Sequence, residues 1–167
     1  DFEGTSPQIN RPINSVMNYT YAYSCYALKC ALDPSAPNND GSFRPITIKA
    51  PEGSIVNAKR PAPVWGRHLT GHYLPPAIYA ALAKLLPDRI LAESGSPLWN
   101  VYFKGQDEKS EKPFIKMFFM NGGHGARPQG DGPGCLSFPS NVSNQSIEQF
   151  ENQVPIIVTE KAFVPDT

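Results

Sequence analysis

The chain has 167 residues, and its 15 lysines and arginines balance its 15 aspartates and glutamates, so the formal net charge is zero. This length is typical of one domain, and a hydrophobic share of 40% is enough for a folded core. Without a basic stripe, nucleic acid and acidic membrane surfaces are poor candidates as partners. The sequence contains no recognisable signal peptide or membrane-spanning stretch, and we therefore expect a cytoplasmic protein.

The first long apolar pattern predicts an amphipathic helix from Val16 to about Leu32. Its apolar residues recur at steps of three and four, the spacing of one helix face: Tyr19, Tyr23, Tyr26, Ala27 and Cys30. Asp33 ends the helix, because the proline that follows disfavours helical backbone in the residue before it. A second helix is predicted over residues 76–86, with two prolines suited to its first turn.

Short strands are predicted where apolar and polar residues alternate or where an apolar run is bounded by turn residues. The expected strands are residues 2–7, 46–49, 55–56, 98–104, 114–120 and 154–162. The run 114–120 is continuously apolar, which is typical of a strand buried on both faces. A capping box at residues 146–149 (SIEQ) predicts a short helix that ends near residue 152.

Prolines (18) and glycines (13) are plentiful between these elements, so much of the chain should lie in ordered loops. Helices and strands alternate irregularly, without the regular winding of a parallel α/β protein. We therefore predict an α+β fold in a single domain over residues 1–167. It should have a mixed sheet, two or three short helices and long ordered Pro/Gly-rich loops.

The most glycine-dense segment, residues 121–134 (NGGHGARPQGDGPG), follows directly after the predicted buried strand. Glycines permit positive φ and close approach of the backbone to a ligand, and successive amides can form an anion-binding concavity. His124 can act as an acid or a base, Arg127 can grip a carboxylate or phosphate, and Asp131 can orient either. We therefore predict catalytic roles for these three residues.

The glycines of the same loop are predicted to bind substrate through their backbone: Gly122, Gly123 and Gly125. The loop lacks Gly-Lys-Ser/Thr, so it is not a Walker P-loop. The alternative reading is a tight structural turn with a hydrogen-bonded histidine.

Residues 38–45 (NNDGSFRP) offer a second polar segment. The amide of Asn39 and the guanidinium of Arg44 are predicted to contribute to substrate binding. An Asx-turn that fixes a following strand is the alternative interpretation of the same residues.

His68 and His72 stand four residues apart, a spacing that brings two imidazoles to one helix face. Such a pair can hold a divalent metal, but no third ligand is identifiable, so no metal-binding residue is predicted. Cys25 and Cys30 fall in the first helix and are expected to be buried thiols. Cys135 follows the glycine loop and is expected to be exposed.

Taken together, several segments in order resemble the hydantoinase B/oxoprolinase family. The matching stretches run nearly from end to end: residues 1–7 (DFEGTSP), 39–45 (NDGSFRP), 50–54 (APEGS), 61–64 (PAPV), 81–83 (ALA), 86–89 (LPDR), 122–128 (GGHGARP), 131–132 (DG) and 146–151 (SIEQFE). Each motif alone is weak, but the ordered set is specific for the family.

The resemblance implies that the chain is an internal fragment of a larger B-type subunit, because family members are several times longer. They work with a hydantoinase A-type partner that uses ATP, either as a separate subunit or fused in one chain. The expectation is thus no cofactor in this chain, ATP and Mg in the partner, and a divalent metal in the parent of the carboxylase branch.

In this family the partner activates a lactam, hydantoin or ketone with ATP, and the B-type part completes hydrolysis or carboxylation. The resemblance therefore implies an ATP-dependent ring-opening amidohydrolase acting on a hydantoin or 5-oxoproline, with the isolated fragment inactive. A ketone carboxylase subunit and a non-catalytic subunit-contact segment remain as alternatives.

Overall fold

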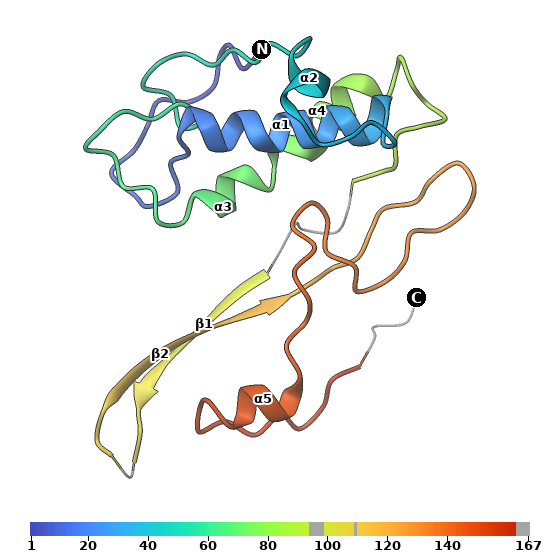
Figure 1. The fold of residues 1–167 in the computed structure, drawn as a ribbon. Helices are drawn as coiled ribbons and strands as arrows, with labels where there is room; N and C mark the ends of the chain where they lie inside the picture. The colour runs from blue at the N-terminus through green and yellow to red at the C-terminus, as the bar shows by residue number, and fades with distance from the viewer. Residues whose placement is uncertain (94–98, 109, 163–167) are drawn as a thin grey trace.

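The computed structural model describes residues 1–93, 99–108 and 110–162. The first part is helical, with α1 (Met17–Leu32), α2 (Asp40–Phe43), α3 (Arg67–Gly71) and α4 (Leu74–Leu82). The second part contains an antiparallel hairpin of β1 (Trp99–Gln106) and β2 (Pro113–Met120), followed by α5 (Ile147–Glu151). The helical part and the hairpin with α5 lie at opposite ends of the molecule (Figure 1). Among the described residues, no helix is long and apolar enough to cross a membrane.

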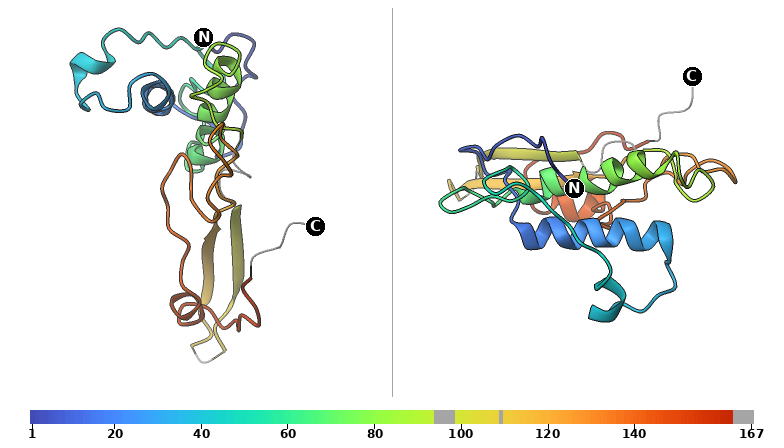
Figure 2. Two further views of the ribbon diagram at one scale, coloured as in Figure 1. Left: turned by 90° about the vertical axis from the view of Figure 1, so that its right-hand side faces the viewer. Right: turned by 90° about the horizontal axis from the view of Figure 1, so that it is seen from above.

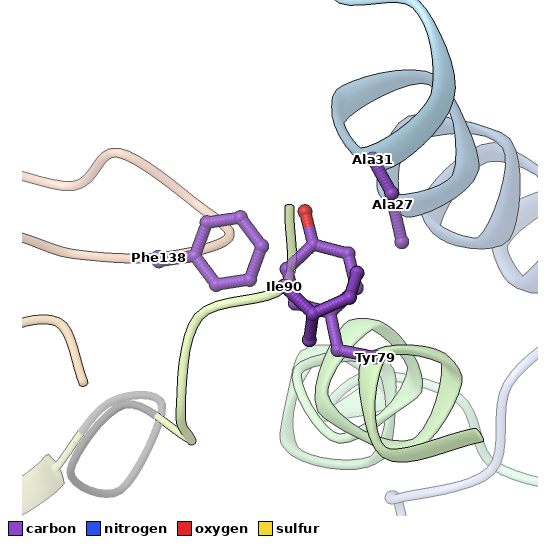
Figure 3. Packing of buried hydrophobic residues seen from close by; sticks show 5 residues of the cluster. All are labelled: Ala27, Ala31, Tyr79, Ile90 and Phe138. Carbon is purple, nitrogen blue, oxygen red and sulfur yellow. The ribbon is translucent and has the colours of Figure 1, made fainter. Parts of the chain in front are cut away.

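The main apolar core lies between α1 and α4 (Figure 3). Ala27 and Ala31 have small side chains on the buried face of α1, and this lets Tyr79 of α4 lie close to them. The Tyr79 ring stacks on Phe138, with ring centroids 5.5 Å apart. Because Phe138 follows the glycine loop in sequence, this contact joins the loop region to the helical part.

Both predicted helices of the first part are present, with adjusted ends. The helix predicted to begin at Val16 is α1, and Val16 is its N-cap. The helix predicted over residues 76–86 is α4, which begins at Leu74 and ends at Leu82, with its two prolines in the first turn. The short α3 is a separate helix, because a proline inside a longer helix would remove a backbone hydrogen bond.

Several predicted strands are absent from the described chain. Residues 46–49 and 154–162 form no strand, and residues 55–56 lie in a turn. Residues 2–7 contribute only an isolated bridge between Pro7 and Ser54. The N-terminal segment and residues 49–55 make scattered backbone hydrogen bonds, such as Ile55 N–H to Ser6 O and Phe2 N–H to Lys49 O, both at 2.9 Å, rather than the repeated pairs that define a ladder.

The α+β class is confirmed, but the sheet of the described residues is the antiparallel hairpin alone. The predicted strands over 98–104 and 114–120 correspond to β1 and β2, and Leu98 lies outside the described residues. Phe103 and Phe118 pack on Phe150 of α5, with centroid distances of 5.1 and 4.6 Å. The expectation of burial on both faces of β2 is wrong for this chain, because Ile115 on the other face is 67% exposed.

The predicted helix at residues 146–152 is α5, and it begins as its capping box requires. The Ser146 side chain accepts a hydrogen bond from the Gln149 backbone N–H. This cap satisfies one of the amides that a helix start leaves without a partner. It also orients Phe150 onto the hairpin, where only 4% of the residue is exposed.

Replacing Phe150 by alanine is expected to lower the free energy of unfolding by about 3 kcal/mol, the usual cost of emptying a buried aromatic site. The Phe150 ring is the only one of α5 that contacts both strands among the described residues. Urea unfolding followed by tryptophan fluorescence measures the change. The exposed neighbour Gln149→Ala is the matched control, and equal stabilities of the two variants would contradict this account of the hairpin.

Candidate functional site

The glycine loop, residues 121–134, leaves the end of β2 and folds back on itself before the chain reaches the core. Hydrogen bonds between its own backbone groups hold this shape. His124 N–H donates to Pro133 O at 3.0 Å, which ties the outgoing arm to the returning arm. Arg127 and Gly130 exchange two backbone hydrogen bonds of 2.9 and 3.0 Å, which close the tip. Ala92 N–H donates to the carbonyl of residue 126 at 2.7 Å. The loop is therefore anchored to the segment that follows α4.

Glycines are required where the two arms and the anchor approach one another. A Cβ on Gly125 would clash with Ala92 O, and one on Gly132 would clash with His124 O. Gly123 has φ of +93°, in the region that favours glycine. Two of the predicted substrate-binding glycines, Gly123 and Gly125, thus have a packing role in the loop, whereas Gly122 is exposed.

His124 is half-buried, and its ring lies edge-on against Phe138 at 5.5 Å between centroids. Burial lowers the pKa of His124, and the positive charge of Arg127 lowers it further. The imidazole is therefore mostly neutral near pH 7, the state in which it can accept a proton.

Arg127 and Asp131 have exposed side chains on the same loop. Arg127 is close enough to His124 to influence its pKa. No salt bridge joins Asp131 to either residue in the part of the chain that the structure describes. Arg127 thus lies within electrostatic range of His124, and both Arg127 and Asp131 have side chains open to solvent.

Asn39 and Arg44 lie away from the glycine loop, on and beside α2. Asn39 Oδ1 accepts a hydrogen bond from Ser42 N at 3.0 Å and caps α2, and Arg44 forms an exposed salt bridge of 3.2 Å with Asp40. Asn39 thus caps a short helix, and the strand that an Asx-turn was expected to fix after it is not formed by the described residues. Both views of Figure 2 place α2 on the side of α1 away from α4, so these residues are not part of the glycine-loop site.

His68 and His72 lie on and directly after α3, with ring centroids 6.0 Å apart. No group of three or more His, Cys, Asp or Glu residues able to hold a metal occurs among residues 1–93, 99–108 and 110–162. His72 is only 3% exposed and lies beside Tyr23, with ring centroids 6.0 Å apart. Burial, with a smaller contribution from His68, lowers the pKa of His72 to about 4.

Acidification is expected to destabilise the protein through His72. Its folded-state pKa of about 4 lies below the unfolded value of 6.5, so the stabilising effect is present above pH 6.5 and is lost as the pH falls toward 4. The full difference corresponds to about 3 kcal/mol. Urea unfolding at pH 7 and pH 4 of the native protein and of His72→Gln measures it. The native protein should lose more stability than the variant, and equal losses would contradict the assignment.

A cavity of about 510 Å³ lies where the hairpin meets both ends of the glycine loop and α5. Its wall includes Gly122, the exposed Cys135 and Lys161. Asn121 also lines it, and its Oδ1 is buried without a hydrogen-bond partner while its Nδ2 donates to Val142 O at 2.7 Å. The volume falls in the range of small-molecule sites, about 300–1,000 Å³.

Sequence reasoning missed this cavity, because segments distant in the chain assemble it. The exposure of Cys135 was predicted and is confirmed, but neither Asn121 nor Lys161 carried a signal. His124 does not line the cavity. The loop therefore has two sides, one with His124 and Arg127 and one that faces the cavity.

These features define an α+β chain in which a histidine-bearing glycine loop links an antiparallel hairpin to a helical core. The whole chain, residues 1–167, matches the hydantoinase B/oxoprolinase family. The chain therefore belongs to this family, and the resemblance seen in its motifs is confirmed.

Individual relatives agree with this membership. The chain is 37% identical to an uncharacterised protein of Methanocaldococcus jannaschii, with 100% of the chain and 29% of the relative covered. It is 34% identical to a candidate B-type subunit of a D-/L-hydantoinase from Pseudomonas sp., with 95% and 28% covered. It is 28% identical to 5-oxoprolinase 1 of Arabidopsis thaliana, with 95% and 12% covered.

The chain thus spans less than a third of the length of these relatives. No solved structure was found to match it.

Proposed function

We propose that this chain is a segment of the B-type subunit of an ATP-dependent amidohydrolase that opens a cyclic amide, a hydantoin or 5-oxoproline. The observation that carries the proposal is the family match over all 167 residues. It is supported by relatives named as the B-type subunit of a hydantoinase and as 5-oxoprolinases. The subunit acts with a hydantoinase A-type partner that binds ATP and Mg, and the two together form the working enzyme in the cytoplasm.

His124 acts as the general base that takes a proton from the water attacking the ring carbonyl that the partner has phosphorylated; the ring C–N bond then breaks, the nitrogen takes up a proton and the phosphate leaves as inorganic phosphate. A phosphorylated ring carbonyl is an acyl-phosphate-like electrophile, and its hydrolysis requires that water lose a proton. A half-buried imidazole with a lowered pKa is neutral at pH 7 and able to take that proton. In the loop it is held by the backbone bond from His124 N–H to Pro133 O.

Arg127 stabilises the negative charge that develops on the substrate. Its guanidinium is exposed and lies near enough to His124 to act electrostatically on it. A planar guanidinium can pair with a carboxylate or phosphate through two donors. Asp131, on the same loop, orients the bound groups.

No step in this proposal uses a metal bound to this chain. The described residues provide the imidazoles of His68 and His72 without a third His, Cys, Asp or Glu beside them, and catalytic zinc sites use three protein ligands. Any divalent metal of the parent would need ligands from other parts of the protein.

The proposal is tested by expressing the full-length subunit with its A-type partner and measuring ATP-dependent opening of 5-oxoproline and of a hydantoin, with and without bicarbonate. Ring opening that does not depend on bicarbonate is the expected result. Consumption of a ketone that requires bicarbonate, with no ring opening, would contradict the proposal and identify a carboxylase. Failure with every substrate, despite ATP binding by the partner, would favour a contact role for this segment.

A further inference from the structure

The hairpin has one covered face and one open face. Residues directly opposite each other in an antiparallel pair share a face, and successive pairs alternate between faces. The pair Val101 and Phe118 faces α5, as the contact of Phe118 with Phe150 shows. The intervening pairs, Tyr102 with Met117 and Lys104 with Ile115, therefore lie on the other face.

The open face is apolar over most of its length. We define it by four side chains: Tyr102, Ile115, Met117 and Phe119. Ile115 is 67% exposed and Tyr102 is 45% exposed. A two-stranded sheet that faces water normally has polar residues on its outer face, so an apolar outer face indicates that another layer covers it.

Charged residues of the hairpin mark where the apolar open face ends. Lys104 lies opposite Ile115, near the turn end of the ladder. Beyond the ladder the segment from Asp107 to Lys112 carries charges of both signs, which is typical of a solvated turn. The apolar surface thus begins at the glycine-loop end of the hairpin, near Phe119, and ends before the turn.

The hairpin has little support among the described residues. Two strands alone are marginally stable in water, and on one face the described chain supplies the short α5, through the ring of Phe150. Neither strand has a second hydrogen-bonded neighbour among the described residues. An apolar cover on the second face would give the hairpin the burial that this chain does not supply.

We propose that the open face is an internal interface of the B-type subunit, covered by an apolar segment from the part of that subunit outside this chain. The inference rests on the proposed membership of a longer B-type subunit. The chain covers only 29% and 28% of two relatives, so most of such a protein remains available to supply the cover. A second copy of the chain is the competing occupant.

Thiol reactivity in the full-length subunit tests this, and its readout does not depend on turnover. Ile115→Cys and Lys112→Cys are made in a Cys135→Ser background, and maleimide modification of the introduced cysteine, resolved from Cys25 and Cys30 by peptide mass spectrometry, is timed in the native state and in urea. Reactivity follows access to the thiol, so native labelling at position 115 should be at least about tenfold slower than in urea. Position 112, in the turn, should differ by less than about twofold between the two states.

Equal labelling rates at position 115 in the native state and in urea would overturn the proposal. The subunit is also diluted until light scattering shows a monomer. If the protection of position 115 from the maleimide is then lost, a second copy covers the face and the proposal is overturned. Hydroxyl-radical footprinting of the unmodified subunit gives the same test without a variant. Tyr102 should be oxidised much less in the native state than in urea, and full oxidation would again count against the interface. Loss of ring opening with protection intact would contradict only the proposed function.

Discussion

His124→Ala is expected to lower kcat for ring opening by about 10²- to 10⁴-fold, the usual contribution of a positioned general base. ATP binding by the partner should be unchanged, because the proposed ATP site lies outside this chain. The pH dependence gives a second test. Burial and Arg127 lower the pKa of His124, so wild-type activity should fall only as the pH drops below the ordinary histidine value. His124→Ala should lose this acid limb.

The controls for this prediction lie on the same loop. Gln129 is exposed at the tip, between Arg127 and Gly130, and Gln129→Ala should retain most of the wild-type kcat. Circular dichroism should show that both variants are folded. A folded His124→Ala subunit with unchanged turnover would remove this residue from the mechanism and leave the loop a structural role.

Asn14→Ala is expected to lower the free energy of unfolding by about 3 kcal/mol or more, because it leaves several buried polar groups without partners. Asn14 is fully buried. Its Nδ2 donates to Ile9 O at 2.7 Å and to Pro63 O at 2.9 Å, and its Oδ1 accepts from Ile9 N–H at 2.9 Å. One side chain thus joins the N-terminal loop to the proline-rich segment near residue 63.

The Asn14→Asp variant distinguishes the loss of the hydrogen-bond donors from the loss of side-chain volume. The carboxylate keeps the acceptor for Ile9 N–H but places a charge against carbonyl oxygens, so it should be at least as damaging as alanine. The exposed Asn38→Ala is the control and should change the unfolding free energy by less than about 1 kcal/mol. Urea unfolding measures all three, and a small loss for both Asn14 variants would contradict the network.

The elements with strong local patterns could be predicted from the sequence. Apolar spacing of three and four residues indicated α1, a capping box indicated α5, and apolar runs bounded by polar residues indicated β1 and β2. The segments at 46–49 and 154–162 have the composition of strands but pair with no strand among the residues that the structure describes. Strand formation depends on a neighbour, and a local pattern does not supply one.

Some features of the candidate site could likewise be predicted from the sequence, and others could not. The glycine density of residues 121–134 identified the loop, where Arg127 lies within electrostatic range of His124. The close approaches of Gly125 to Ala92 O and of Gly132 to His124 O depend on contacts across the fold. The cavity beside Asn121 and the separation of α2 from the loop also depend on tertiary packing. These features leave no periodic signal in the sequence.

The central claim is that the B-type subunit completes a reaction that its partner begins. The most direct measurement is the ring-opened product formed in the presence of ATP by the A-type partner alone, by the full-length subunit alone and by the two together. Product should form at a substantial rate only when both are present, and His124→Ala should reduce it. Ring opening by the partner alone, at the same rate as by the pair, would contradict the account.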